Sequence, residues 1–159
     1  MKRKNINIEY KEYLNKEELS KEEILLLERA AQAAESAYAP YSNFHVGAAL
    51  LLSNGEIVAA SNQENAAYPS GLCAERVAVF YAHAKYPAES ILSMAVTAMV
   101  DGKLCKTPTY PCGACRQVLS ESEKRAGSPI KIIIGGEKVI QIVEGISSLL
   151  PFAFDNVSK

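Results

Sequence analysis

Three cysteines stand where two helices are predicted to begin. Cys73 opens one helix, and Cys112 and Cys115 lie three residues apart at the start of the other. Residues three apart on a helix share a face, with Cβ atoms ~5–6 Å apart, which suits two thiolates on one tetrahedral metal. The partial positive charge of a helix N-terminus also lowers the pKa of a thiol. The pattern therefore predicts a zinc site, and three protein ligands leave the open position of a catalytic site.

Glu75 and Arg76 follow Cys73 closely and add the remaining chemistry. Glu75 is too close to Cys73 to ligate the same ion comfortably, but it is well placed to take a proton from water on the metal. Zinc with three thiolates carries a net negative charge, which opposes the formation of hydroxide. Arg76 and the two helix ends can offset that charge. The sequence thus predicts Glu75 as the proton-transfer group and Arg76 as a group that tunes the metal.

Other interpretations of the cysteines stay open at this point. A lone Cys-x-x-Cys segment is more often a redox pair or half of a structural zinc site. Cys105 could supply a fourth ligand and close the site, although its position after a predicted strand is more typical of a free thiol. His45 and His83 lie in no ligand-type spacing. A Cys-x-Glu segment ahead of Pro-Cys-x-x-Cys favours the catalytic interpretation.

Two predicted helices, at about residues 72–84 and 112–122, carry these groups. Ser20 and Glu23 form a capping box that opens an earlier helix with a small-residue face, and Pro40 stops it. The predicted strands span residues 44–52, 56–61, 91–100, 130–134 and 138–143. This order of elements predicts an α/β sandwich with one mixed sheet.

Two short glycine-containing connections determine the relative direction of the strands that they join. Asn54-Gly55 tolerates the positive φ angles of a tight hairpin, so the first two strands are expected to be antiparallel. Gly135-Gly136 leaves too short a connection for a crossover, so the last two strands are also expected to be antiparallel. Residues 1–19 alternate weakly, and an edge strand and a mobile arm are equally open for them.

Composition excludes several functional classes. The chain has 159 residues, 17 basic and 18 acidic side chains, a net charge of −1 and 48% hydrophobic residues, which fits one domain over residues 1–159. There is no apolar run of about 18 residues to span a membrane, and the basic start leads into charged sequence unlike a signal peptide. We therefore expect a cytoplasmic protein with reduced thiols. Arg76 is the only basic residue between Arg29 and Lys85, so no nucleic-acid track crosses the middle of the chain.

Several segments besides the cysteines carry a family resemblance. They are residues 37–49 (AYAPYSNFHVGAA), residues 62–68 (NQENAAY), Cys115-Arg116-Gln117, and Leu149-Leu150-Pro151 with Phe154. Together with the cysteine motifs they resemble the zinc-dependent cytidine/deoxycytidine deaminase family, small-subunit type, over about residues 22–155. The resemblance implies a three-layer α/β/α sandwich with a single mixed five-stranded sheet whose last two strands are antiparallel. It also implies a homotetramer that hydrolyses cytidine and deoxycytidine to uridine and deoxyuridine plus ammonia in pyrimidine salvage.

The resemblance assigns roles around the metal. Cys73, Cys112 and Cys115 would bind Zn²⁺, Glu75 would be the proton shuttle, and Arg76 would hydrogen-bond the zinc thiolates. Without the resemblance, the same residues leave a structural zinc site as an alternative.

The resemblance also implies a set of substrate contacts. Asn62 and Glu64 would hold the ribose 3′-hydroxyl, and the backbone amide of Ala74 would contact the pyrimidine O2. Phe44 would pack near the base, and Phe154 would stack on it from a neighbouring subunit. By residue type alone, the two polar residues lie in an ordinary solvated loop and the two aromatics are ordinary hydrophobics.

Two departures from the family pattern bear on pocket shape and assembly: Tyr110 stands where serine is common, and Phe152 where a small residue is common. Two alternative functions follow. One is the same chemistry on another amino-pyrimidine nucleoside, such as blasticidin S. The other is a non-catalytic domain stabilised by a structural zinc site, with Cys105 as the fourth ligand.

Overall fold

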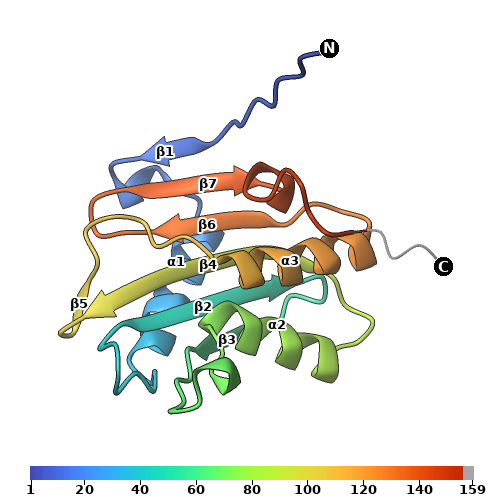
Figure 1. Cartoon of the computed structure of the whole chain (residues 1–159). Coiled ribbons are helices and arrows are strands. Elements are labelled where there is room, and N and C mark those ends of the chain that lie inside the picture. Colours follow the sequence, from blue (N-terminus) through green and yellow to red (C-terminus); the bar gives the residue numbers. More distant parts are fainter. Residues whose placement is uncertain (156–159) are drawn as a thin grey trace.

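A single mixed β-sheet with helices on both faces positions the predicted site (Figure 1). The computed structural model describes residues 1–155. The sheet order is β1-β7-β6-β4-β2-β3, with β5 paired to β4; β4 and β6 are parallel, and all other pairs are antiparallel. The strands are β1 (Lys11–Tyr13), β2 (His45–Leu52), β3 (Ile57–Ser61), β4 (Ile91–Val100), β5 (Lys103–Leu104), β6 (Lys131–Gly135) and β7 (Ile140–Glu144).

Three helices cover the sheet in a three-layer α/β/α arrangement. Helix α1 (Lys21–Ala34) packs on one face, and α2 (Ala74–Lys85) and α3 (Gly113–Ala126) pack side by side on the other (Figure 1). The short 3₁₀ helices are η1 (Lys16–Glu18), η2 (Tyr68–Ser70) and η3 (Ile146–Ser148). The α/β fold class is therefore confirmed, as are the antiparallel β2–β3 hairpin and the antiparallel final pair β6–β7. No helix within residues 1–155 combines the length and the apolar character needed to cross a membrane.

Helix α1 begins where the sequence predicts. The Ser20 side chain accepts a hydrogen bond from the Glu23 amide at 3.2 Å, and the Glu23 carboxylate accepts one from the Ser20 amide at 2.8 Å, which completes the capping box. The helix ends at Ala34, earlier than Pro40 alone would require. The reason lies in tertiary hydrogen bonds: the Tyr38 amide donates to the Asn62 carbonyl at 3.1 Å, which draws this segment out of the helix.

The small-residue face of α1 is needed for a close approach to β2. A Cβ atom on Gly47 would lie 1.9 Å from the carbonyl oxygen of Ala30, so only glycine fits this crossing. Ala30 and Ala34 are fully buried on the same helix face. Side chains alternate across β2, so Ala49 joins the core under α1 while Leu50 joins the core under α2 and α3.

The expected count of five strands is wrong, because the sheet has seven. β5 consists of two residues that fold back on β4 through Asp101, at φ 51°, and Gly102, a run too short to show any periodicity. β1 comes from the N-terminal extension, so the edge strand that the weak alternation allows there does form, but only over the three residues Lys-Glu-Tyr. β1 forms through partners far along the chain: Gln141 on β7 donates to Glu12 at 2.7 Å and accepts from the Tyr110 hydroxyl at 2.5 Å.

Candidate active site

The N-termini of α2 and α3 bring three thiols into one cluster. The Sγ atoms of Cys73, Cys112 and Cys115 all lie within 4.8 Å of one another, with 3.7 Å between Cys73 and Cys112 and 3.4 Å between Cys112 and Cys115. Cys73 and Cys112 are the N-cap residues of α2 and α3, and neither side chain caps its helix. The free amides of both helix ends therefore direct partial positive charge at the cluster.

Arg76 supplies positive charge to the same cluster. Its Nη2 lies 3.8 Å from the Sγ atom of Cys73, while its buried Nε has no hydrogen-bond partner within residues 1–155. The pKa of the Cys73 thiol is lowered to about 5, first by the hydrogen bond with Cys115 and then by the contact with Arg76. Thiolate is the form that ligates a metal, so the donor set and its surroundings fit a Zn²⁺ ion.

Cys105 does not belong to this group of thiols. The metal-sized cluster within residues 1–155 contains only the three cysteines of the two helix starts. Cys105 follows β5, where its backbone amide donates to the Ala98 carbonyl at 2.9 Å and its carbonyl accepts from the Glu137 amide at 2.8 Å. Burial raises the pKa of its thiol. This placement matches the free thiol, not the fourth ligand of a closed zinc site.

Glu75 lies in the first turn of α2 and is buried, with 4% of its surface exposed. Burial raises the pKa of its carboxyl to about 7, and the neighbouring Cys73 adds to the rise. A carboxyl with such a pKa can hold or release a proton at neutral pH, as a general acid–base group must. A glutamate is rarely buried to this depth without a specific partner.

A cavity of about 460 Å³ opens beside Cys73. Its walls come from three loops, which follow α1, β3 and η2, and from the start of α2. Residues lining it are Tyr41, Ser42, Asn62, Gln63, Glu64, Asn65, Tyr68, Gly71, Leu72, Cys73 and Arg76. A cavity of this size is in the range of pockets that hold small organic ligands.

Two tyrosines that no sequence motif pairs form the aromatic part of this cavity. Tyr41 and Tyr68 pack edge to face, with ring centroids 6.1 Å apart and an angle of 66° between the rings. Both rings are about half exposed or more. Tyr41 lies in the loop before the β2–β3 hairpin and Tyr68 begins η2 after it, so no local pattern in the sequence could have paired them.

Asn62 is half-buried on the cavity wall and binds the backbone near the start of β2. Its Oδ1 accepts a hydrogen bond from the Val46 amide at 2.8 Å, and its Nδ2 donates to the Phe44 carbonyl at 3.0 Å. A primary amide has two donor protons and two acceptor lone pairs. One of each therefore stays available for a ligand in the cavity.

Glu64 lies at the exposed rim and closes the turn after α1. One carboxylate oxygen accepts from the amides of Tyr41 at 2.9 Å and Ser42 at 3.3 Å, and the other accepts from the Ser42 hydroxyl. These bonds, with that from the Ser42 hydroxyl first, lower the pKa of Glu64. The carboxylate is thus held as an anion with its position fixed by the turn.

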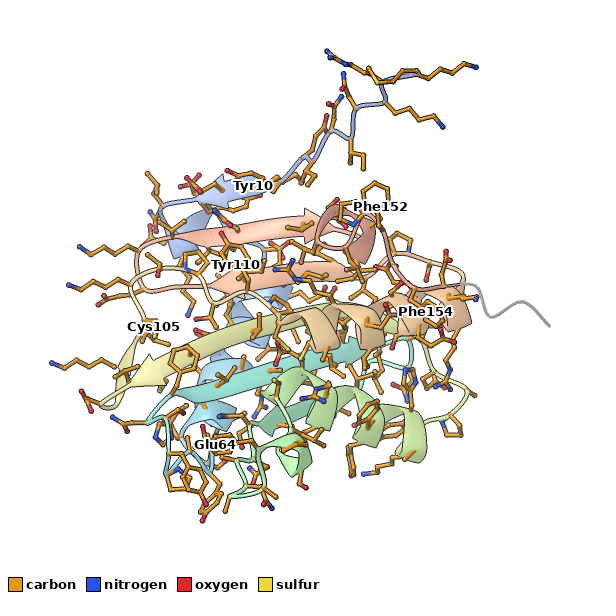
Figure 2. All side chains as sticks on the ribbon, viewed as in Figure 1. Tyr10, Glu64, Cys105, Tyr110, Phe152 and Phe154 are labelled. Carbon is orange, nitrogen blue, oxygen red and sulfur yellow. The ribbon has the colours of Figure 1, made fainter. Side chains whose placement is uncertain are left out.

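The other three predicted substrate contacts do not line this cavity. Phe44 is half-buried before β2, and Ala74 is buried at the first position of α2. Phe154 is 71% exposed. The Gln117 side chain accepts a hydrogen bond from the backbone amide of Phe154 at 3.2 Å and donates one to the Phe154 carbonyl at 2.7 Å. Figure 2 shows Phe154 beside α3 and well apart from Glu64. Within one chain the structure therefore brings Asn62 and Glu64 to the cysteines, but not Phe154.

The cytidine and deoxycytidylate deaminase zinc-binding region matches this chain over residues 20–127. The chain belongs to this family. The matched region contains all three clustered cysteines, so the metal that the cluster fits, Zn²⁺, is the metal for which the family region is named.

Individual members of the deaminase family match most of the chain. A cytidine deaminase of Halalkalibacterium halodurans is 41% identical over 131 residues, which cover 82% of this chain and 92% of the relative. The crystal structure of cytidine deaminase from Burkholderia pseudomallei has a TM-score of 0.72 and 36% identity, covering 86% of this chain and 100% of that one. Cytidine deaminase from Mycobacterium tuberculosis has a TM-score of 0.64 and 34% identity, covering 83% and 96%.

Proposed function

We propose that this chain catalyses the hydrolytic deamination of cytidine and deoxycytidine to uridine and deoxyuridine, with release of ammonia. The observation that carries the proposal is the buried Glu75 beside three clustered thiols, one of which, Cys73, lines a cavity of about 460 Å³. The relatives and solved structures that cover most of the chain are named cytidine deaminases, which supports the same conclusion.

The roles proposed around the metal follow from the donor groups. Cys73, Cys112 and Cys115 would hold Zn²⁺, which when bound would lower the pKa of water from ~15.7 toward ~7 and so supply a nucleophile at neutral pH. Glu75 takes a proton from the attacking water and delivers it to N3 of the pyrimidine. It then takes the proton of the hydroxyl newly bonded to C4 and passes it to the amine, so that the C4 carbonyl forms and ammonia leaves. The guanidinium of Arg76 offsets the negative charge of the thiolates.

One carboxyl can serve as base and then acid because its pKa lies near the working pH. The burial of Glu75, which raises that pKa to about 7, provides this match. Burial also keeps bulk water from the carboxyl, so that its proton goes to the bound substrate.

A nucleoside fits the cavity better than a nucleotide. The charged side chains lining it are Glu64 and Arg76, and the Arg76 guanidinium already contacts the Cys73 sulfur. Phosphate recognition commonly uses arginine or lysine side chains directed at the anion. A negative Glu64 at the rim would instead repel a phosphate.

The remaining proposed contacts bind the nucleoside itself. Asn62 and Glu64 hold the ribose 3′-hydroxyl, using the donor and the acceptor positions that their backbone contacts leave available. The amide of Ala74, at the uncapped N-terminus of α2, binds the pyrimidine O2. Phe44 packs near the base.

Phe154 is proposed to stack on the base in a neighbouring subunit of a homotetramer. Its 71% exposure and its distance from the cavity of its own chain support a role between subunits. The proposed setting is pyrimidine salvage in the cytoplasm, where thiols stay reduced.

The loss of ultraviolet absorbance on mixing purified protein with cytidine tests the function directly, with deoxycytidine and deoxycytidylate measured alongside. We expect turnover of both nucleosides, little turnover of the nucleotide, and loss of activity after zinc chelation that added zinc restores. Zinc at one per chain without turnover of either nucleoside would contradict the proposal. Turnover of blasticidin S alone would then assign the same chemistry to a modified nucleoside.

A further inference from the structure

Residues 2–10, called here the N-terminal arm, leave the sheet at β1 and project away from the body of the protein (Figure 1). All of them are exposed, and no hydrogen bond joins them to the rest of residues 1–155. A groove of about 430 Å³, lined partly by Tyr10 of the arm and Ile142 of β7, separates the arm from its own sheet. The region matched by the family begins at residue 20, so the arm lies outside it.

One face of the arm is apolar and lacks any partner among the described residues. Ile6, Ile8 and Tyr10 are 53%, 51% and 57% exposed. Side chains alternate along an extended strand, so these three share one face with Lys4 before them and Glu12 after them. The arm continues into β1, the terminal strand of the sheet, whose outer edge is free to pair with another strand.

The sequence of this face is complementary to itself in the antiparallel direction. Placing a two-fold axis at Ile8 sets Ile8 against Ile8 of a second copy and Ile6 against its Tyr10. The same register sets Lys4 against Glu12 of the second copy, and symmetry repeats this ion pair once more. On the opposite face it brings no like charges together: Arg3 faces Tyr13, Asn5 faces Lys11 and Asn7 faces Glu9.

Neighbouring registers lose this match. An axis at Ile6 would set Lys4 against Ile8, and an axis at Tyr10 would set Ile8 against Glu12. Charged and apolar side chains would then lie opposite each other within the apolar segment, which removes the gain from cross-strand pairs. In the proposed register the one such pair, Lys2 with Leu14, lies at the outer ends.

We propose that the arm is an interaction surface for a second copy of this chain, pairing antiparallel about Ile8 to extend the β1 edge of both sheets. A lipid surface fits less well, because the apolar face carries the anion Glu12 at one end as well as the cations Lys2 and Lys4 at the other. Glu12 uses only Oε2 to bind Gln141, so its other oxygen is free for Lys4. The pairing is independent of the proposed activity.

Disulfide trapping in the zinc-loaded full chain tests the register. Ile8→Cys is made in a Cys105→Ser background, so that the new thiol is the reactive one. Residues directly opposite in an antiparallel pair have Cα atoms ~4.5–5.5 Å apart, within the reach of a disulfide. We expect oxidised glutathione to link Ile8→Cys chains into dimers on a non-reducing gel, at least about 10-fold faster than matched Asn7→Cys chains.

The Asn7→Cys control differs by one position but cannot form the bond. Asn7 faces Glu9 in the proposed register, so two Asn7 positions lie roughly 8 Å apart, beyond a disulfide's limit. A mixture of Asn7→Cys and Glu9→Cys chains should link again. Equal rates for Ile8→Cys and Asn7→Cys would indicate random encounters and overturn the proposal.

A charge swap tests the partner. Lys4→Glu in the Ile8→Cys chain creates two like-charged pairs by symmetry and should slow the linkage roughly 10-fold. Adding Glu12→Lys should restore the rate. Failure of the double variant to recover would overturn the register. Sedimentation of the unmodified chain with phosphatidylserine vesicles, together with no linkage at Ile8→Cys, would assign the arm to a lipid surface instead.

Discussion

The N-terminus of α1 differs sharply from those of α2 and α3. At α1, Ser20 and Glu23 satisfy the free amides with their own side chains in a capping box. At α2 and α3 the N-cap residues are Cys73 and Cys112, and neither side chain caps its helix. A good capping residue stabilises a helix by about 1 kcal/mol, so both helices give up stability at the positions where the thiols gather.

This difference separates a helix end that completes the fold from helix ends that serve chemistry. The amides at α1 are occupied within the chain, whereas those at α2 and α3 stay available to thiolates and to a ligand. Glu64 combines features of both groups. It accepts hydrogen bonds from the backbone, as Glu23 does, but it also lines the cavity. Removing each group should therefore have a different consequence.

Removing a clustered thiol should have the largest effect. Cys112→Ala leaves two thiols for the metal, so we expect loss of bound zinc and of all measurable deamination. Zinc per chain and cytidine turnover are the two measurements.

Cys105→Ser is the matched control for that variant. Its thiol lies outside the cluster, so zinc content and turnover should both stay at the level of the unmodified chain. Release of zinc by Cys105→Ser would show instead that the site is closed by four cysteines.

Glu75→Gln should have the next largest effect. The amide fills the same space but cannot transfer the proton, so kcat should fall by about 10²–10⁴ while zinc content and the melting temperature change little. Glu121→Gln, an exposed carboxylate on α3, is the control and should leave kcat unchanged. Retained turnover in Glu75→Gln would rule out its assignment as the proton shuttle.

The zinc side of the site could be predicted because its signals are local. Spacing within one helix turn places Cys112 near Cys115, and the helix predicted over about residues 72–84 places Cys73 at its start. The cavity side depends on loops that meet only in the folded chain. The Tyr41–Tyr68 contact and the turn held by Glu64 arise from tertiary hydrogen bonds and packing, for which sequence spacing carries no signal.

The same distinction explains the errors in the predicted fold. Long strands such as β4 show their burial in a continuous apolar run, and the capping box marks α1 to the residue. β1 and β5 have three and two residues, so their pairing is determined by β7 and β4, not by their own sequence. Elements whose stability comes from distant partners are therefore the ones that sequence reasoning misses.

Ser42→Ala should have a smaller effect, on substrate binding alone. The hydroxyl of Ser42 holds one oxygen of Glu64 and also accepts from the Phe44 amide at 3.0 Å. Losing bonds worth about 1 kcal/mol should raise KM roughly 5-fold, with kcat and zinc content unchanged. Ser42→Thr keeps the hydroxyl and should recover most of the KM. A fall in kcat with an unchanged KM would instead connect this turn to the chemical step.

Glu23→Gln should have the smallest effect, confined to stability and to low pH. Burial raises the pKa of Glu23, but hydrogen bonds from the Ser20 amide and Lys131 outweigh it, so the pKa lies below its ordinary value of 4.5. A lowered carboxyl pKa stabilises the fold above the unfolded-state value, and this contribution is lost as the pH falls through the folded-state pKa.

Glutamine can still complete a capping box, so Glu23→Gln removes mainly the ion pair with Lys131 at 3.2 Å, which is partly exposed. We expect a loss of less than about 1 kcal/mol at pH 7. The difference from the unmodified chain should shrink below about pH 4.5 in urea unfolding, while turnover is unchanged. Glu22→Gln, in the same helix turn but exposed, is the control. An equal loss of stability in both variants would attribute the effect to the helix dipole. The N-terminus of α1 would then differ from those of α2 and α3 in charge alone, not in capping.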